Sequence, residues 1–215
     1  MSVETTDLLD MDDLTAAELT TVLDRAAAIK AGEDDTDLPR QTLAMVFEKP
    51  STRTRTSFET AMTRLGGHAI FLGPDDIHLG HGEPVKDTAR ALAGYADAIM
   101  ARLFDHADVE ELAADADVPV VNGLTDDAHP CQTLADLLTV RETFGGFDDV
   151  TVAWVGDGNN VAQSFVLGAA LADLDLTVTT PPEYGIDDEV LDRAAALGST
   201  PTLVDDPAEA VADAD

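Results

Sequence analysis

The chain has 215 residues, and its 12 Lys and Arg against 43 Asp and Glu give a formal net charge of −31 at pH 7. Nucleic acids and anionic membranes would be repelled at long range, and so few cations cannot build a basic face. We therefore expect neither as a partner. Hydrophobic residues make up 45% of the chain, which excludes an acidic disordered tail and predicts one large folded domain or two small ones.

The acidic residues are mostly aspartate, with 31 Asp among the 43 acids and only three Lys in the chain. Because molar salt screens the mutual repulsion of such a surface over a very short distance, the composition predicts a protein of a salt-rich cytosol. The single cysteine, Cys131, cannot form an internal disulfide, and no secretory signal or membrane-spanning apolar stretch is visible. We therefore expect a soluble, cytoplasmic protein.

Apolar runs alternate with amphipathic segments, which is typical of an α/β fold with mostly parallel sheets flanked by helices. Up to Gly145 and Gly146, helices are expected at 14–30, 52–65, 85–95, 108–116 and 131–144, and strands at 42–47, 68–72, 98–103 and 118–121. After this glycine pair, strands are expected at 150–155, 175–180 and 202–204, and helices at 160–173 and 187–197.

The same pattern predicts two domains, with a boundary near residues 138–147. Residues 1–140 supply a complete α/β domain, whereas residues 141–215 supply two or three strands, fewer than the ~5–6 of a typical sheet. We therefore expect residues 141–215 to form the first part of an incomplete second domain. The chain also stops within an expected helix that has no C-cap residue, which favours a truncated protein.

The densest group of cations lies in residues 47–59 (FEKPSTRTRTSFE), between an expected strand and an expected helix. Three of the chain's twelve cations fall within seven residues of this stretch. Ser51 or Thr52 can cap the helix, so that several backbone N–H groups at its start point outward. A helix start surrounded by hydroxyl and guanidinium groups is a typical phosphate site. The alternative is an ordinary capped helix with an exposed basic face.

Four segments in chain order resemble those of the aspartate/ornithine carbamoyltransferases, and of the ornithine enzymes in particular. Residues 51–55 (STRTR) resemble the carbamoyl phosphate signature, and residues 78–83 (HLGHGE) with 86–90 (KDTAR) resemble the mobile loop and the helix after it. Residues 129–136 (HPCQTLAD) resemble the His-Pro-x-Gln segment, and residues 156–161 (GDGNNV) resemble the amino-acid-binding turn. With four motifs in order, the chain is identified as a member of this superfamily.

The resemblance implies transfer of a carbamoyl group from carbamoyl phosphate to the side-chain amine of L-ornithine, giving L-citrulline and phosphate without metal or cofactor. Charge develops on the carbamoyl oxygen in such a reaction, so oriented donors at that oxygen should dominate the rate. The implied catalytic residues are Arg53, Arg102 and His129. The implied carbamoyl phosphate ligands are Ser51, Thr52, Arg53, Thr54, Arg102, His129 and Gln132.

Each of these residues has an implied role. The phosphate is held by Ser51, Thr52, Arg53 and Thr54. Arg102 bridges the phosphate and the carbonyl oxygen, and His129 donates to that oxygen. Gln132 fixes the carbamoyl NH2. Taken singly, Arg102 would be a surface charge at a strand end, and His129 would be a loop residue that caps the next helix. Cys131 is assigned no catalytic role, because no base adjoins it and the mechanism forms no covalent intermediate.

The resemblance also implies a homotrimer with shared active sites, in which His78 reaches the phosphate bound by a neighbouring subunit. The alternative is a plain loop histidine. In the turn at 156–161, Asn160 is expected to bind ornithine, since its amide can donate to a carboxylate and accept from an ammonium. A dinucleotide site is disfavoured, because Val161 takes the place of a third glycine and the second strand, around Thr177, does not end in an acid.

The acceptor amine is expected to be ornithine, because His81 in the loop and the Asn159-Asn160 pair are closer to the ornithine enzymes. Putrescine is an alternative acceptor, and a non-catalytic carbamoyl phosphate-binding module is the hypothesis from another class. The family's Asp-x-x-x-Ser-Met-Gly and His-Cys-Leu-Pro segments, which bind the acceptor, have no counterpart before Asp215. We therefore expect the 215-residue chain by itself to be inactive.

Overall fold

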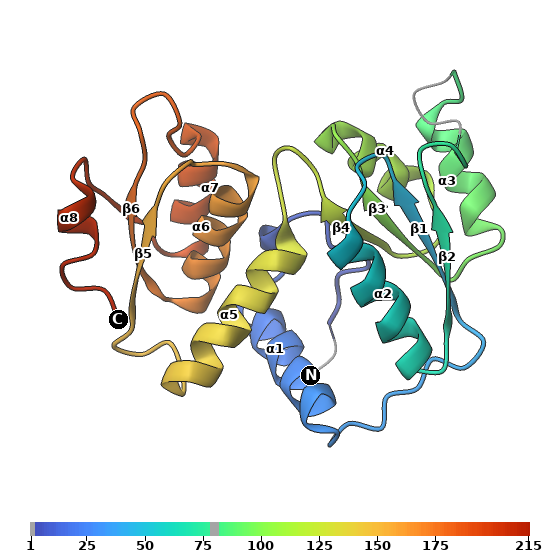
Figure 1. Ribbon diagram of the computed structural model, residues 1–215, viewed down its shortest axis with the longest axis horizontal. Coiled ribbons are helices and arrows are strands. Elements are labelled where there is room, and N and C mark those ends of the chain that lie inside the picture. Colours follow the sequence, from blue (N-terminus) through green and yellow to red (C-terminus); the bar gives the residue numbers. More distant parts are fainter. Residues whose placement is uncertain (1–2, 78–81) are drawn as a thin grey trace. The chain divides into compact units, whose positions relative to one another are not determined.

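The computed structural model describes residues 3–77 and 82–215, which form two compact units (Figure 1). The N-terminal unit contains Thr5–Leu9 and Ala28–Asp126, and the C-terminal unit contains Asp10–Ala27 and Asp127–Asp215. Each unit has a parallel sheet with helices against it, which confirms the predicted α/β class.

The N-terminal unit is built on a four-stranded parallel sheet in the order β2-β1-β3-β4. The central strand β1 is buried over its last five residues, as its apolar sequence TLAMVF predicts. The elements of this unit are β1 (Thr42–Phe47), α2 (Thr52–Arg64), β2 (His68–Leu72), α3 (Val85–Ala93), β3 (Ala98–Arg102), α4 (His106–Asp115) and β4 (Val120–Leu124).

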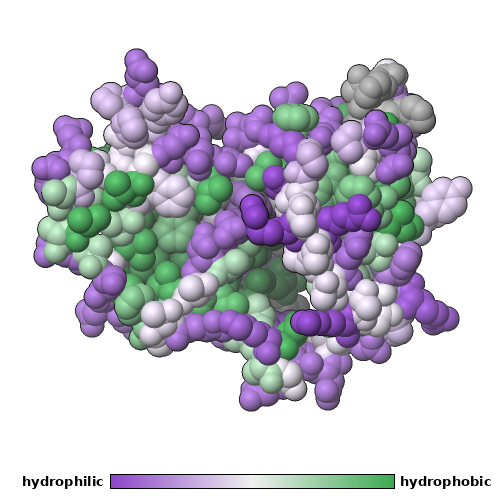
Figure 2. Space-filling view, viewed as in Figure 1, coloured by the Kyte–Doolittle hydropathy of each residue, from purple (hydrophilic) through white to green (hydrophobic). Residues whose placement is uncertain are grey.

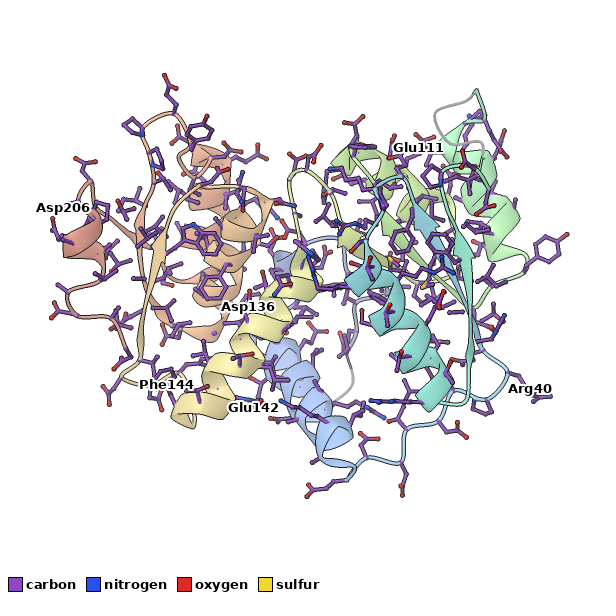
Figure 3. All side chains as sticks on the ribbon, in the orientation of Figure 1. Arg40, Glu111, Asp136, Glu142, Phe144 and Asp206 are labelled. Carbon is purple, nitrogen blue, oxygen red and sulfur yellow. The ribbon has the colours of Figure 1, made fainter. Side chains whose placement is uncertain are left out.

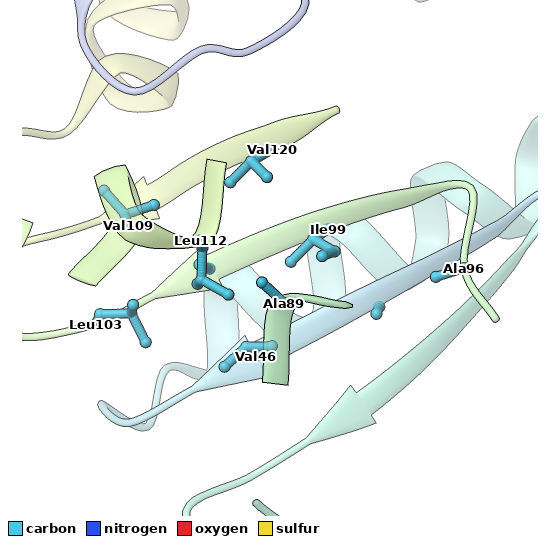
Figure 4. Packing of buried hydrophobic residues seen from close by; sticks show 10 residues of the cluster. Val46, Ala89, Ala96, Ile99, Leu103, Val109, Leu112 and Val120 are labelled. Carbon is cyan, nitrogen blue, oxygen red and sulfur yellow. The ribbon is translucent and has the colours of Figure 1, made fainter. Parts of the chain in front are cut away.

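Alternate residues of β1 point to opposite faces of this sheet, and each face has its own hydrophobic cluster. On one face, Val46 and Ile99 pack with Leu112 of α4 and Ala89 of α3, as Figure 4 shows. On the other face, Met45 and Phe47 pack with residues of α2 and β2. The helix that begins with the cationic stretch is therefore held against the sheet by a core of its own.

The strand expected at 118–121 is wrong in its bounds, because β4 runs from Val120 to Leu124. Pro119 has no N–H to donate to the sheet, so regular pairing begins after it. The polar Asn122 looks like a loop residue in the sequence, but it is fully buried and donates from Nδ2 to the Leu9 carbonyl at 2.9 Å. The segment around Leu8, which pairs with Val121, supplies this partner from over a hundred residues away.

The C-terminal unit is centred on a single buried helix, α6, of which nine residues are buried. A parallel sheet in the order β5-β6-β7 packs with it, as do the short 3-10 helix η1 and helices α5 and α7. The elements are η1 (Met11–Asp13), α1 (Ala16–Ala31, whose last residues belong to the N-terminal unit), α5 (Pro130–Phe144), β5 (Thr151–Val155), α6 (Asn160–Ala172), β6 (Asp175–Thr179), α7 (Asp188–Leu197), β7 (Thr202–Leu203) and α8 (Pro207–Ala210). The short η1 had no counterpart in the expected pattern, whereas α8 lies where a helix was expected at the end of the chain.

Strand β5 lies at an edge of its sheet and is only partly covered. Its last residue, Val155, is 52% exposed, and Leu203 of β7 is 55% exposed. Figure 2 shows hydrophobic residues gathered over the part of the C-terminal unit that contains β5, while hydrophilic residues dominate elsewhere on the visible face. Within the described ranges, no helix is both long and apolar enough to cross a bilayer.

Candidate active site

The phosphate site expected from the sequence lies at the start of α2, directly after the central strand β1. Ser51 is the N-cap: its Oγ accepts from the Thr54 backbone N–H at 3.3 Å and donates to Thr54 Oγ1 at 3.0 Å. The backbone N–H groups of Thr52 and Arg53 have no acceptor within the described part of the chain. The predicted capped helix start is thus confirmed, with two N–H groups available for an anion.

The first turn of α2 holds cations and no acid, which opposes the helix macrodipole. Arg55 is used within the protein, because it donates to Glu59 at 2.9 Å and lies over the Phe71 ring at 3.8 Å. Arg53 is exposed and has no such partner in the residues that the structure describes. The two arginines of the motif therefore differ, and only Arg53 is left for a ligand.

Arg102 lies at the end of β3, where its backbone is in register with Phe47 at the end of β1. Burial lowers the pKa of Arg102, and the positive charge of Arg53 lowers it further. Its buried Nε has no hydrogen-bond partner among the described residues. Two neighbouring guanidinium groups without a carboxylate form a site that an anion would stabilise.

The pairing of β3 with β4 shifts register between Ala101 and Arg102, which marks a β-bulge. Bulges bend a strand and redirect a side chain, and they are frequent beside functional sites. No signal in the sequence indicates this bulge, because it depends on how two distant segments pair.

Glu48 and Lys49 hold the segment that follows Arg102, a role that the sequence reasoning missed. The Glu48 N–H donates to the Arg102 carbonyl at 2.9 Å, and Glu48 Oε2 accepts from the Phe104 N–H at 3.0 Å. Lys49 forms an ion pair with Asp126 and lies over the Phe104 ring at 4.5 Å. The residues before α2 thus tie the two arginine-bearing segments to each other.

In the C-terminal unit, His129 is the N-cap of α5, the position predicted by the alternative of a loop residue that caps the next helix. Its side chain forms no capping hydrogen bond. Its backbone N–H donates to Ser164 Oγ at 2.9 Å. Gln132 lies in the first turn of α5, where its Nε2 donates to Asp136 at 2.9 Å. Burial raises the pKa of Asp136, shown on α5 in Figure 3, and the hydrogen bond from Gln132 opposes that rise.

The turn after β5 positions the expected ornithine ligand, Asn160, as the first residue of α6. Asn159 caps the helix, its Oδ1 accepting from the backbone N–H groups of Val161 and Ala162 at 3.0 and 3.3 Å. A Cβ on Gly158 would lie 2.5 Å from the Gly185 carbonyl oxygen, so the turn needs glycine there because the chain's own backbone approaches. This glycine is explained without a dinucleotide.

Burial raises the pKa of the Cys131 thiol to about 12, which fits the expectation that this residue is not a nucleophile. His78 lies outside the described residues, as does His81. Ser51, Thr52, Arg53, Thr54 and Arg102 are gathered in the N-terminal unit, and His129, Gln132 and Asn160 in the C-terminal unit.

Comparisons with known proteins agree with these motifs. Residues 6–142 match the model of the aspartate/ornithine carbamoyltransferase carbamoyl-P binding domain, and residues 148–215 match that of the Asp/Orn binding domain. An ornithine carbamoyltransferase of Haloquadratum walsbyi is 69% identical over 99% of this chain and 71% of its own length. One of Bacillus subtilis is 50% identical over 97% of this chain and 67% of its own length.

The fold leads to the same group of proteins. The structure of the ornithine carbamoyltransferase from Pyrococcus furiosus superposes with a TM-score of 0.92 and 48% identity, covering all of this chain and 72% of that one. Both compact units, the capped α2 and the His-Pro-x-Gln segment thus occur in a chain that matches these enzymes over nearly its whole length. On this evidence, the chain belongs to the ornithine carbamoyltransferase family.

Proposed function

We propose that this protein transfers the carbamoyl group of carbamoyl phosphate to the side-chain amine of L-ornithine, giving L-citrulline and phosphate. The observation that carries the proposal is the pair of neighbouring arginines formed by Arg53, in the first turn of α2, and Arg102, at the end of β3. In a chain with 43 acids and 12 cations, two adjacent guanidinium groups lack a carboxylate among the described residues. A dianionic phosphate supplies the missing charge.

The phosphate end of the substrate is assigned to the N-terminal unit. Ser51, Thr52 and Thr54 offer hydroxyl and backbone donors at the helix start, and Arg53 adds a guanidinium group. Arg102 bridges the phosphate and the carbonyl oxygen, so it stabilises both the leaving group and the charge that develops as the amine attacks. These donors need no reorganisation, because β1, β3 and the Glu48 hydrogen bonds fix the backbone that carries them.

The carbamoyl and acceptor ends are assigned to the C-terminal unit. His129 donates to the carbonyl oxygen, and Gln132 fixes the carbamoyl NH2. Asn160 binds the amino-acid end of ornithine through its side-chain amide. The amine must attack as the neutral form, because an ammonium has no lone pair to form the new C–N bond.

The domain division and the assembly are part of the same proposal. Residues 1–140 bind carbamoyl phosphate and residues 141–215 contribute to ornithine binding, in keeping with the two matched domain descriptions. The active form is a cytoplasmic homotrimer in which His78 acts on the phosphate of a neighbouring subunit. The net charge of −31 fits a salt-rich cytosol, and the Haloquadratum relative comes from a halophile.

The test is citrulline formation from carbamoyl phosphate and ornithine in about molar KCl, where charge repulsion is screened. Because the chain spans 71% of the Haloquadratum enzyme, two proteins are compared: the 215-residue chain and a fusion completed with the rest of that enzyme. We expect activity in the fusion, and its loss in the fusion with Arg102→Ala, which shows that this chain's own residues do the chemistry.

Other outcomes would contradict the proposal. If the fusion binds carbamoyl phosphate but forms no citrulline, a binding module is the better description. If putrescine replaces ornithine with a higher kcat/KM, the acceptor is assigned wrongly.

A further inference from the structure

A chain of buried hydrogen bonds holds the backbone of His129, and the roles proposed above for the site residues do not account for it. The His129 N–H donates to Ser164 Oγ at 2.9 Å, and Ser164 Oγ donates to Asp10 Oδ1 at 2.8 Å. Ser164 is fully buried, and Asp10 is only 7% exposed. Helix α5 is thereby linked at its N-cap residue to α6 and, through α6, to the N-cap of η1.

The direction of these bonds is fixed by chemistry. An ionised carboxylate only accepts hydrogen bonds, so the hydroxyl proton of Ser164 must point at Asp10. The lone pairs of the hydroxyl then face the His129 N–H. A serine hydroxyl whose donor and acceptor functions are both used has one orientation, and it fixes the position of the amide that it binds.

Asp10 is in turn held from several directions. Its Oδ1 also accepts from the Met11 N–H at 2.8 Å, and its Oδ2 accepts from Arg193 Nη2 at 2.8 Å. Arg193 donates from Nε to Asp12 at 2.8 Å as well, so one guanidinium is shared by two carboxylates. The carboxylate that orients Ser164 is therefore paired, and its burial does not leave an isolated charge.

A second contact on the same side of α6 fixes the distance between α5 and α6. Gly168 lies one turn after Ser164, and a Cβ there would be 2.4 Å from Thr133 Cγ2. Thr133 is fully buried, and its Oγ1 has no hydrogen-bond partner within the described part of the chain. Close packing at Gly168 sets the distance between α5 and α6, and the hydrogen bond at Ser164 fixes the position of α5 along the axis of α6.

Helix α5 needs such an anchor, because His129 occupies the N-cap without a side-chain capping bond of the kind that Ser, Thr, Asp or Asn would form. The residue used for chemistry thus takes the place of the residue that would normally fix the helix start. An oxyanion donor must be held within a fraction of an ångström to be effective.

We infer that Ser164, oriented by Asp10 and Arg193, is a positioning residue for His129 in carbamoyl transfer. This inference rests on the proposed function, since it assigns Ser164 to the placement of the donor to the carbonyl oxygen. Ser164 touches no reacting atom; it acts through the backbone of His129. Its removal should impair the transition state more than the binding of the substrate.

The experiment compares Ser164→Ala, Ser164→Cys and Thr133→Val in the completed fusion. Ser164→Ala removes the donor and the acceptor and should lower kcat by about 10- to 100-fold, while KM for carbamoyl phosphate changes by less than about threefold. Ser164→Cys keeps a weak donor and acceptor and should give an intermediate kcat. Thr133→Val is the matched control, because it alters the same helix pair at a hydroxyl that anchors nothing, and it should leave kcat within about twofold.

A second readout is independent of activity. Amide hydrogen exchange at His129 should become at least about tenfold faster in Ser164→Ala and remain unchanged in Thr133→Val, since only the former loses the acceptor. Unchanged kcat with unchanged exchange in Ser164→Ala, or an equal loss of kcat in Thr133→Val, would overturn the inference. If the parent fusion forms no citrulline, the proposed function fails, and the exchange at His129 still decides whether Ser164 holds the start of α5.

Discussion

Arg193 in the C-terminal unit and the pair Arg53 and Arg102 in the N-terminal unit have opposite surroundings. In the C-terminal unit, Arg193 donates to Asp10 and Asp12, and the hydrogen bond that it donates to Asp12 raises the pKa of Arg193 above the ordinary value. In the N-terminal unit, Arg53 and Arg102 lie close enough for the charge of one to lower the pKa of the other, and neither has a carboxylate partner among the described residues. The absence of a carboxylate beside Arg53 and Arg102 favours their proposed role in binding an external anion, whereas the paired Arg193 stabilises the fold.

Replacing an unpaired arginine should have the largest effect on activity. In the completed fusion, Arg102→Ala should reduce the rate of citrulline formation by about 10³-fold or more, because the phosphate and the developing oxyanion both lose a charged donor. Arg141→Ala serves as the control, since Arg141 is a paired arginine whose partner, Asp24, is in the same unit, and it should retain the parent rate within about twofold. A near-normal rate for Arg102→Ala would refute the site.

Replacing the paired arginine should have the largest effect on stability. Arg193→Ala leaves Asp10 and Asp12 without their cation and should lower the free energy of unfolding by about 2–4 kcal/mol. Denaturant unfolding in constant KCl measures the change, and Arg193→Lys should recover only part of it, because lysine lacks the planar fork. By the same measurement, Arg102→Ala should change stability by less than about 0.5 kcal/mol. Equal losses in the two alanine variants would remove the distinction.

Inorganic phosphate should stabilise the protein through the unpaired pair alone. At ten times its dissociation constant, phosphate adds about 1.4 kcal/mol, which raises the midpoint of thermal unfolding by about 3–6 °C for a chain of this size. Arg53→Ala and Arg102→Ala should lose this shift, whereas Arg193→Ala should melt lower and still show it. A shift that persists in Arg102→Ala would place phosphate elsewhere.

The smallest expected effect concerns Asp136, whose pKa burial raises. A raised pKa means that the folded state holds the proton more tightly than the unfolded chain. The contribution of Asp136 to stability is therefore fully present below its unfolded pKa of about 3.9 and is lost as the pH rises through its folded pKa. Asp136→Asn should accordingly stabilise the protein near pH 7 by less than about 1 kcal/mol, because solvent and salt screen a half-exposed group. Thermal unfolding at several pH values should show this gain shrinking as the pH falls, and a constant gain would contradict it.

Local signals in the sequence predicted most of the elements. The strand at 42–47 and the strand at 68–72 have the expected bounds, because short apolar runs between polar segments suffice to define them. The N-cap at Ser51 was also predictable, since serine before a helical pattern has few other uses. The strand at 118–121 was misplaced, because the burial of Asn122 depends on a partner at Leu9.

The site was predictable where it rests on motifs and not where it rests on long-range pairing. The bulge at Arg102 and the hydrogen bonds of Glu48 follow from the register of three strands, which no local pattern encodes. Ser164 left a weak trace, as a polar residue on the buried side of a mostly apolar helix, but its partners lie 35 and 154 residues away in the chain. Geometry of this kind becomes visible only in three dimensions.

The thiol of Cys131, a partly exposed residue, can report on local opening of the protein. It is the only cysteine in the chain and lies two residues after His129, at the start of α5. With its pKa raised to about 12, almost no reactive thiolate exists at neutral pH while the helix start stays closed. We therefore expect alkylation of the native protein to be slow, and its rate to increase in variants in which the start of α5 detaches more often from its neighbours.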